Sequence, residues 1–202
     1  DEERDIVQKL HHSFTGSEKL RKHMKCLFRY GCMYNVCNSN LLFHASMPLN
    51  EDGSLKEVDI LGKKYKGKAL LSRVGESIRT AYFAENDNEE KAFALDYVWY
   101  LWCGKNSPAF DKSKMATFER YFLTDKETHK EVKGFYYTLR DREDICDIIM
   151  DEFGVEGEHR HIINGHVPVR SKNGESPVKC GGKILVIDGG FSKAYRLATS
   201  NR

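Results

Sequence analysis

The chain has 202 residues, of which 40% are hydrophobic and 31% charged, a composition typical of a soluble globular protein. Its 32 basic residues nearly balance its 30 acidic ones, and this balance argues against a general nucleic-acid surface. The sequence contains no apolar run of roughly the 18 residues that a membrane span requires, and it shows no signal-peptide pattern. Its six cysteines form no C-x-x-C pair, which argues against a structural zinc site. We therefore expect a cytoplasmic protein with reduced thiols, neither bound to nucleic acid nor to a membrane.

The first third of the chain predicts two helices followed by two hairpins. Ser17 stands where it can cap the second helix, and Gly31 is suited to end it. Short apolar runs joined by polar turn residues then predict the hairpins. The predicted ranges are 1–10 and 18–30 for the helices, and 33–43 and 57–66 for the hairpins.

The middle of the chain, from 69 to 154, is predicted to be largely helical. Apolar residues four apart indicate a helix over 69–85, and a capping box over 87–90 opens a helix that Gly104 ends. The helical spacing of Trp99 and Trp102 predicts that both are core residues. A further helix over 114–123, capped by Ser113, has Met115, Phe118 and Phe122 on its predicted apolar side; residues 134–139 suit a strand, and Asp141 is predicted to cap a helix that Gly154 ends.

Polar residues follow three short apolar runs at predicted strand ends. His166 lies at the end of the run 162–163 within an Asn-Gly-His turn, and Asp188 ends the run 183–187. His44 follows the run 41–43 in the same way. Helices and strands alternate, so the sequence predicts an α/β protein, and ligands gather at strand ends in such sheets. The alternative is that these are ordinary turns with structural histidines, and the residues alone leave both open.

Three segments carry a resemblance to a known family. LLFHASMPLNEDG (41–53), WYLWCGKNSPAFDKSKMATFERYFL (99–123) and NGHVPVRSKNGESPVKCGGKILVIDGGFSKAY (164–195) resemble the class III fructose-1,6-bisphosphatases of bacteria, which are calcineurin-like metallophosphatases. The resemblance implies part of a β-sandwich flanked by helices, with 69–154 as a largely helical insertion in a single incomplete domain of residues 1–202. It also implies Mn²⁺-dependent removal of the 1-phosphate of fructose 1,6-bisphosphate in gluconeogenesis.

The resemblance also assigns roles to single residues. His44 and His166 match positions where the superfamily binds two metals, and neutral imidazole is a good ligand for Mn²⁺. Asp188 is placed beside those ligands. For the substrate phosphates we name Lys114, Arg120 and Lys193, whose alternative is ordinary surface charge. The alternatives for the whole protein are another calcineurin-like phosphatase, or a catalytically inactive interaction module of that fold.

Several family motifs are absent from the sequence. It contains no Gly-Asp dipeptide and no Asn-His-Glu, which supply the other metal ligands and the general-acid histidine in the superfamily. We therefore expect an interior-to-C-terminal portion of a longer enzyme, with the general acid upstream. Two imidazoles without carboxylates make a weak site, so we expect this chain alone to bind Mn²⁺ poorly, to lack phosphatase activity and to self-associate, and the whole enzyme to be a homo-oligomer.

Overall fold

The computed structural model describes residues 2–169 and 174–187 of the chain. These residues form a mixed α/β structure, as the alternation of elements predicts. In chain order the helices are α1 (Glu2–Thr15), α2 (Glu18–Tyr30), α3 (Gly67–Phe83), α4 (Glu89–Cys103), α5 (Thr117–Phe122), α6 (Phe135–Leu139) and α7 (Glu143–Glu152), with the 3-10 helices η1 (Lys126–His129) and η3 (Cys180–Gly182). The strands are β1 (Tyr34–Cys37), β2 (Asn40–Phe43), β3 (Val58–Ile60), β4 (Lys63–Tyr65), β5 (His161–Asn164), β6 (Val178–Lys179) and β7 (Ile184–Val186).

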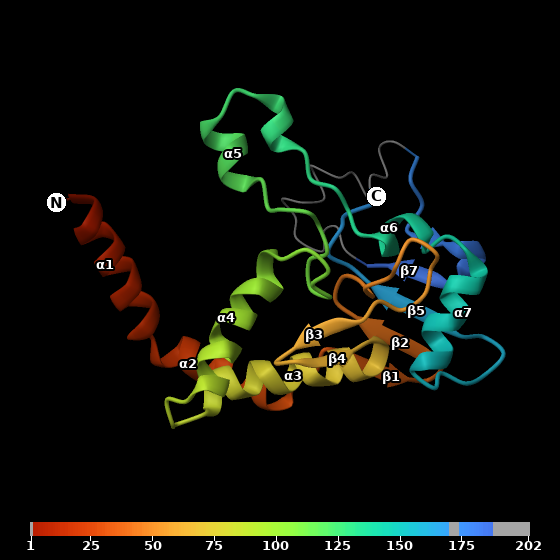
Figure 1. The fold of residues 1–202 in the computed structure, drawn as a ribbon, viewed down its shortest axis with the longest axis horizontal. Coiled ribbons are helices and arrows are strands. Elements are labelled where there is room, and N and C mark those ends of the chain that lie inside the picture. Colours follow the sequence, from red (N-terminus) through yellow and green to blue (C-terminus); the bar gives the residue numbers. More distant parts are fainter. Residues whose placement is uncertain (1, 170–173, 188–202) are drawn as a thin grey trace.

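Five of the strands form one sheet in the order β1-β2-β5-β7-β6, and β3 pairs with β4 in a separate hairpin (Figure 1). The central strands β2, β5 and β7 are parallel to one another, while β1 and β6 lie antiparallel on the two edges. Since parallel strands end at the same edge of a sheet, the residues that follow β2, β5 and β7 come out side by side. The edge where these three strands end is called the carboxyl edge below.

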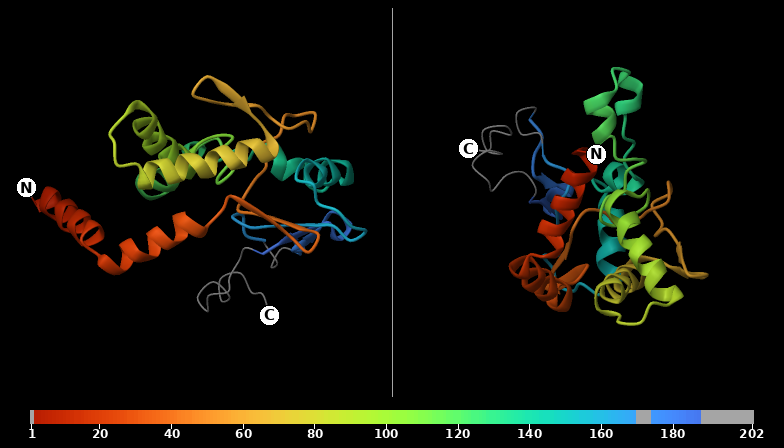
Figure 2. Two further views of the ribbon diagram at one scale, coloured as in Figure 1. Left: turned by 90° about the horizontal axis from the view of Figure 1, so that it is seen from below. Right: turned by 90° about the vertical axis from the view of Figure 1, so that its left-hand side faces the viewer.

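The main core lies between this sheet and α7. Burial alternates along β2 and β5, so that Leu41, Phe43 and Ile162 are buried while their neighbours Leu42 and Ile163 are half-buried. Helix α7 presents Ile145, Cys146, Ile149 and Met150 to the buried face. Figure 2 shows α3 and α7 on one side of the sheet, and a second core forms where α3 packs on α4 and on the β3–β4 hairpin. Among the described residues, the helices include none long and apolar enough to cross a membrane.

The second helix follows its sequence signals closely, whereas the first extends to Thr15, five residues beyond the predicted range. The hydroxyl of Ser17 accepts the amide hydrogen bond of Leu20 at 3.2 Å, and the amide of Gly31 donates to the carbonyl of Leu27, so both ends of α2 are capped as predicted. Helix α1 projects from the body of the molecule, and none of its residues is buried (Figure 1).

Two predictions for the segment between α5 and β5 are wrong. Residues 135–139 form helix α6 instead of a strand, because Tyr136 and Tyr137 are consecutive and both buried, whereas a strand would turn one of them outward. Asp141 does not cap the next helix, which begins one residue later than expected with Arg142 as its N-cap and no side-chain cap bond. Arg142 pairs instead with Asp144.

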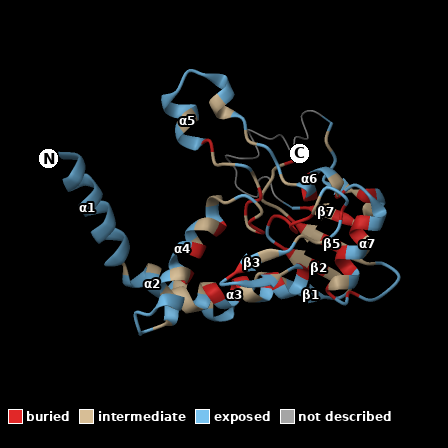
Figure 3. Ribbon diagram, viewed as in Figure 1, coloured by how far each residue is buried: buried red, intermediate tan, exposed pale blue. Residues whose placement is uncertain are grey.

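The predicted burial of the tryptophans is also wrong. Trp99 and Trp102 are 65% and 59% exposed, and their rings contact each other edge-on at 5.2 Å. Figure 3 shows that most of α4 is exposed or half-buried. Helix α4 is apolar nearly all round, so spacing alone cannot choose its buried face, and the structure buries Ala94, Tyr97 and Leu101 instead. The cap of α4 is Asn88, inside the predicted box.

Helix α5 is shorter and more exposed than the sequence predicts. It begins at Thr117, and the hydroxyl of Ser113 accepts a hydrogen bond from the amide of Val132 instead of capping the helix. Phe118 and Phe122, predicted as part of its apolar side, are 73% and 78% exposed in the described structure. The aromatic spacing here indicates a helix but does not indicate what covers it.

Candidate functional site

His44 and His166 meet at the carboxyl edge of the sheet. His44 directly follows β2, and His166 lies two residues beyond the end of the neighbouring strand β5. Their ring centroids are 5.1 Å apart, with the rings inclined by 62°. Two residues separated by 122 positions in the sequence therefore present their imidazoles to one place, as their positions after adjacent parallel strands dictate.

The turn after β5 brings the second histidine back toward the first. The amide of Gly165 donates to the carbonyl of His44 at 2.9 Å, so the two loops are joined through their backbones. His166 adopts a φ of 65°, a left-handed conformation that is uncommon outside glycine. Such conformations persist where surrounding contacts enforce them, and they concentrate at functional sites.

A buried amide side chain holds these loops in register. Asn164 is 1% exposed, and its Nδ2 donates to the carbonyl of Ala45 at 3.1 Å and to the hydroxyl of Tyr136 at 2.7 Å. Burial raises the pKa of Tyr136 far above its usual value, so this hydroxyl stays neutral. The sequence identified Asn164 only as a turn residue; its position immediately before Gly165 and His166 is the signal that could have indicated this role.

Two hollows open beside the histidine pair. One, of about 540 Å³, is lined by His44 and His166 together with Leu42, Ile163 and Asn164. The other, of about 390 Å³, lies between the same two histidines and apolar residues of α2, α3 and α4. The surroundings are thus mostly apolar, with the imidazoles among the few polar groups, an arrangement common in ligand sites.

The histidine pair fits part of a metal site. Imidazole nitrogens are good ligands for Mn²⁺, Fe and Zn²⁺, and strand ends hold them rigidly. Over residues 2–169 and 174–187, however, no group of three or more His, Cys, Asp or Glu side chains stands close enough to hold a metal ion. The described residues therefore supply two donors, and a stable site needs further ligands.

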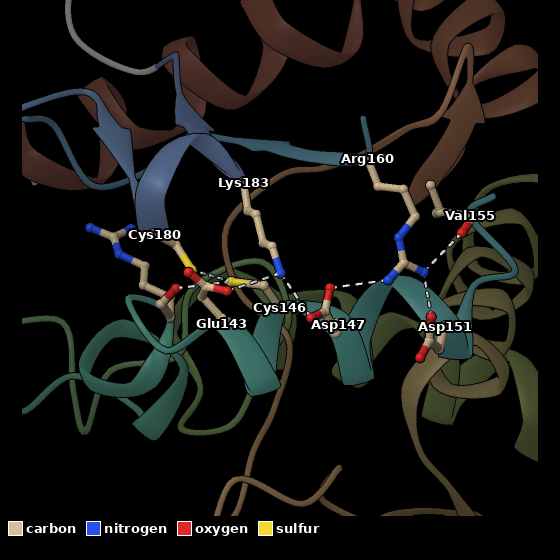
Figure 4. A network of polar contacts seen from close by, with 9 residues as sticks. Glu143, Cys146, Asp147, Asp151, Val155, Arg160, Cys180 and Lys183 are labelled. Atoms are coloured by element: carbon tan, nitrogen blue, oxygen red, sulfur yellow. Dashed lines mark hydrogen bonds and ion pairs between the residues drawn. The ribbon is translucent and has the colours of Figure 1, made fainter. Parts of the chain in front are cut away.

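A polar network occupies the opposite edge of the sheet, where β5 and β7 begin (Figure 4). Asp147 on α7 accepts from Lys183 at 2.8 Å and from Arg160 at 3.0 Å, and Arg160 also pairs with Asp151. The bond from Lys183 lowers the pKa of Asp147, with Arg160 adding to the effect. A hollow of about 880 Å³ adjoins this network, but both cations already have carboxylate partners. We interpret the network as a connection between α7 and the sheet.

The family model described as Firmicute fructose-1,6-bisphosphatase matches residues 1–201. The chain belongs to this family. Among its relatives, the class 3 fructose-1,6-bisphosphatase of Phocaeicola vulgatus is 71% identical over 199 residues, and that of Porphyromonas gingivalis is 54% identical over 199 residues. The enzyme of Parabacteroides distasonis is 66% identical over 198 residues. Each alignment covers 98% of this chain but 30% of the relative, and no solved structure matches.

The family resemblance expected from the sequence is thus confirmed, and the chain spans about 30% of the length of the fructose-1,6-bisphosphatases it matches. Two of the residues predicted to contact phosphate are Arg120 in α5 and Lys114, three residues before α5 begins, and α5 stands away from the sheet (Figure 1). The ammonium of Lys114 donates to the carbonyl of Thr128 at 2.5 Å, and Arg120 pairs with Glu131 at 3.3 Å. Asp188 and Lys193 lie outside the described residues.

Proposed function

We propose that this chain is part of a metal-dependent fructose-1,6-bisphosphatase that hydrolyses the 1-phosphate of fructose 1,6-bisphosphate in gluconeogenesis. The observation that carries the proposal is the 5.1 Å approach of His44 and His166 in a chain that belongs to the fructose-1,6-bisphosphatase family. The names of the relatives support the substrate, and each describes a protein about three times as long as this chain.

In this proposal His44 and His166 each donate an imidazole nitrogen to a binuclear Mn²⁺ site. The bound metals would supply an activated water for attack on phosphorus and would neutralise charge on the phosphoryl oxygens. The chain's own contribution is to hold the two donors at a fixed separation, through the Gly165 amide and the Asn164 side chain. The remaining ligands and the general acid come from the part of the longer enzyme that this chain does not cover.

The fold, oligomeric state and phosphate contacts of the longer enzyme are also inferred. We infer a calcineurin-like sandwich in a cytoplasmic homo-oligomer, with the five-stranded sheet as one layer and residues 69–154 as the insertion. Leu42, Ile163 and Leu185 are cross-strand neighbours on the face of the sheet that α7 does not cover, and all three are half-buried. This apolar face supports the inference of a second layer. Asp188 beside the metals, and Lys114, Arg120 and Lys193 at the phosphates, stay predictions that rest on resemblance and charge.

The test uses the full gene product and a panel of phosphate esters with added Mn²⁺. We expect fructose 1,6-bisphosphate to be the preferred substrate, and His44→Ala or His166→Ala to lower kcat/KM by about a hundredfold or more. His129→Ala is the matched control, because that histidine lies on the segment between α5 and α6 and contacts the carbonyl of Leu123. Turnover that survives both histidine substitutions at the carboxyl edge, or a preference for another ester, would refute the proposal.

A further inference from the structure

A buried carboxylate lies behind the loop that carries His44, and the proposed function does not use it. Asp111 is 2% exposed, and its Oδ2 accepts a hydrogen bond from the hydroxyl of Ser46 at 2.6 Å. Ser46 is itself fully buried and stands two residues after His44. Burying a carboxylate is unfavourable unless hydrogen bonds or charges compensate, so a carboxylate at this position requires an explanation.

The surroundings of Asp111 shift the pKa of its carboxyl group in opposite directions. Burial raises its pKa, whereas the Ser46 hydroxyl, the Asn106 backbone amide and the charges of Lys56 and Lys105 lower it. Both hydrogen-bonding partners are donors, which matches a carboxylate that accepts on its oxygens. An asparagine in its place would offer one acceptor oxygen instead of two.

The backbone at Asp111 is held in an unusual conformation. Its φ of 51° lies in the left-handed region, and its carbonyl accepts from the amide of Gly134 at 2.8 Å. A Cβ at position 134 would lie 2.0 Å from Oδ2 of Asp111, so glycine is required there. The carboxylate is thus fixed between Gly134 on one side and Ser46 on the other.

The segment 107–111 also contacts the second histidine. The ring of Phe110 meets the ring of His166 edge-on, with centroids 5.7 Å apart, and the carbonyl of Pro108 accepts from the amide of Ser46 at 3.1 Å. The buried hydroxyl of Ser107 donates to the carbonyl of Leu101 at 2.6 Å, which ties the segment to the end of α4. One short segment therefore connects α4 to both histidine loops.

We propose that Asp111 is a positioning residue: through Ser46 it fixes the loop that carries His44, while the adjacent Phe110 fixes the ring of His166. The segment 107–111 then sets the separation of the two imidazoles. The link to metal binding rests on the proposed function, but the placement of the rings does not. Asp111 acts through Ser46 and is not assigned any contact with substrate or metal.

The experiment compares Asp111→Asn and Ser46→Ala in the full gene product. With selectively ¹⁵N-labelled histidine and no metal, we expect both substitutions to move the imidazole resonances of His44 and His166. We expect the Mn²⁺ concentration for half-maximal activity to rise about tenfold, while KM at saturating Mn²⁺ stays within about twofold of wild type. Because both substitutions act on the same Ser46–Asp111 hydrogen bond, the double variant should be no worse than the more affected single variant.

Asp147→Asn is the matched control, since it removes a carboxylate that bonds Lys183 and Arg160 at the opposite edge of the sheet. It should leave both histidine resonances and the Mn²⁺ dependence unchanged. Unmoved resonances in Asp111→Asn and Ser46→Ala, or equal movement in Asp147→Asn, would overturn the proposal. Mn²⁺ dependence that persists in His44→Ala and His166→Ala would refute the proposed function instead, and the metal-free resonances would still decide the role of Asp111.

Discussion

Tyr136→Phe removes a single hydroxyl from the interior while leaving the ring in place. The ring of Tyr136 is fully buried and contacts Phe43 edge-on at 5.7 Å, and phenylalanine preserves that packing. The hydroxyl accepts from Nδ2 of Asn164 at 2.7 Å, and the second Nδ2 hydrogen is already used by the carbonyl of Ala45. The substitution therefore leaves one buried amide hydrogen without an acceptor.

An unsatisfied buried donor costs about 1–3 kcal/mol, so Tyr136→Phe should lower the free energy of unfolding by that amount. Because burial holds the pKa of Tyr136 far above its usual value, the hydroxyl stays neutral and the loss should not vary between about pH 6 and about pH 9. Urea denaturation of the full gene product, followed by a probe in the sheet, measures the change.

Tyr121→Phe serves as the control for this substitution, since Tyr121 is 79% exposed and should change stability by less than about 0.5 kcal/mol. Equal stabilities for Tyr136→Phe and wild type would refute the reasoning, because they would mean that Asn164 does not depend on this hydroxyl. A loss as large for Tyr121→Phe would refute it as well.

Leu101→Ala should cost about 2–5 kcal/mol of stability in denaturation, while Trp99→Ser changes it little; equal losses would contradict the assigned face of α4. Burial raises the pKa of Cys146, so iodoacetamide at mildly alkaline pH should label exposed Cys26 well before Cys146 by peptide mapping. The hydrogen bond from Lys183 lowers the pKa of Asp147 in the folded protein, so this carboxylate stabilises the fold above its unfolded pKa. That stabilisation is lost as the pH falls through the folded pKa. The free energy of unfolding of Asp147→Asn should therefore fall less steeply than that of the wild type at acidic pH.

Local signals predicted the elements whose ends are set by nearby residues. Ser17 and Gly31 act within one helical turn, and the turns after β2 and β5 place His44 and His166 without reference to distant parts of the chain. The parallel order of β2 and β5, which brings the two rings to 5.1 Å, follows from how α/β chains connect their strands.

Long-range packing decided the features that the sequence did not reveal. Trp99 and Leu101 lie on one apolar helix, and only the position of α3 determines which is buried. The role of Asp111 could not be predicted from local sequence, because its partners Ser46 and Gly134 lie 65 positions before it and 23 after it. The sequence predicts a strand over Tyr136 and Tyr137, whereas the burial of both side chains requires a helix.

The most direct test of the central claim is the metal content of the full gene product after purification with Mn²⁺ and desalting. We predict that the wild-type protein retains bound Mn²⁺ and that the double variant His44→Ala, His166→Ala loses most of it. His129→Ala should retain the wild-type amount, because His129 contacts the carbonyl of Leu123 and is not placed at the carboxyl edge. Equal Mn²⁺ in the double variant and the wild type would contradict the assignment of these two histidines as metal ligands.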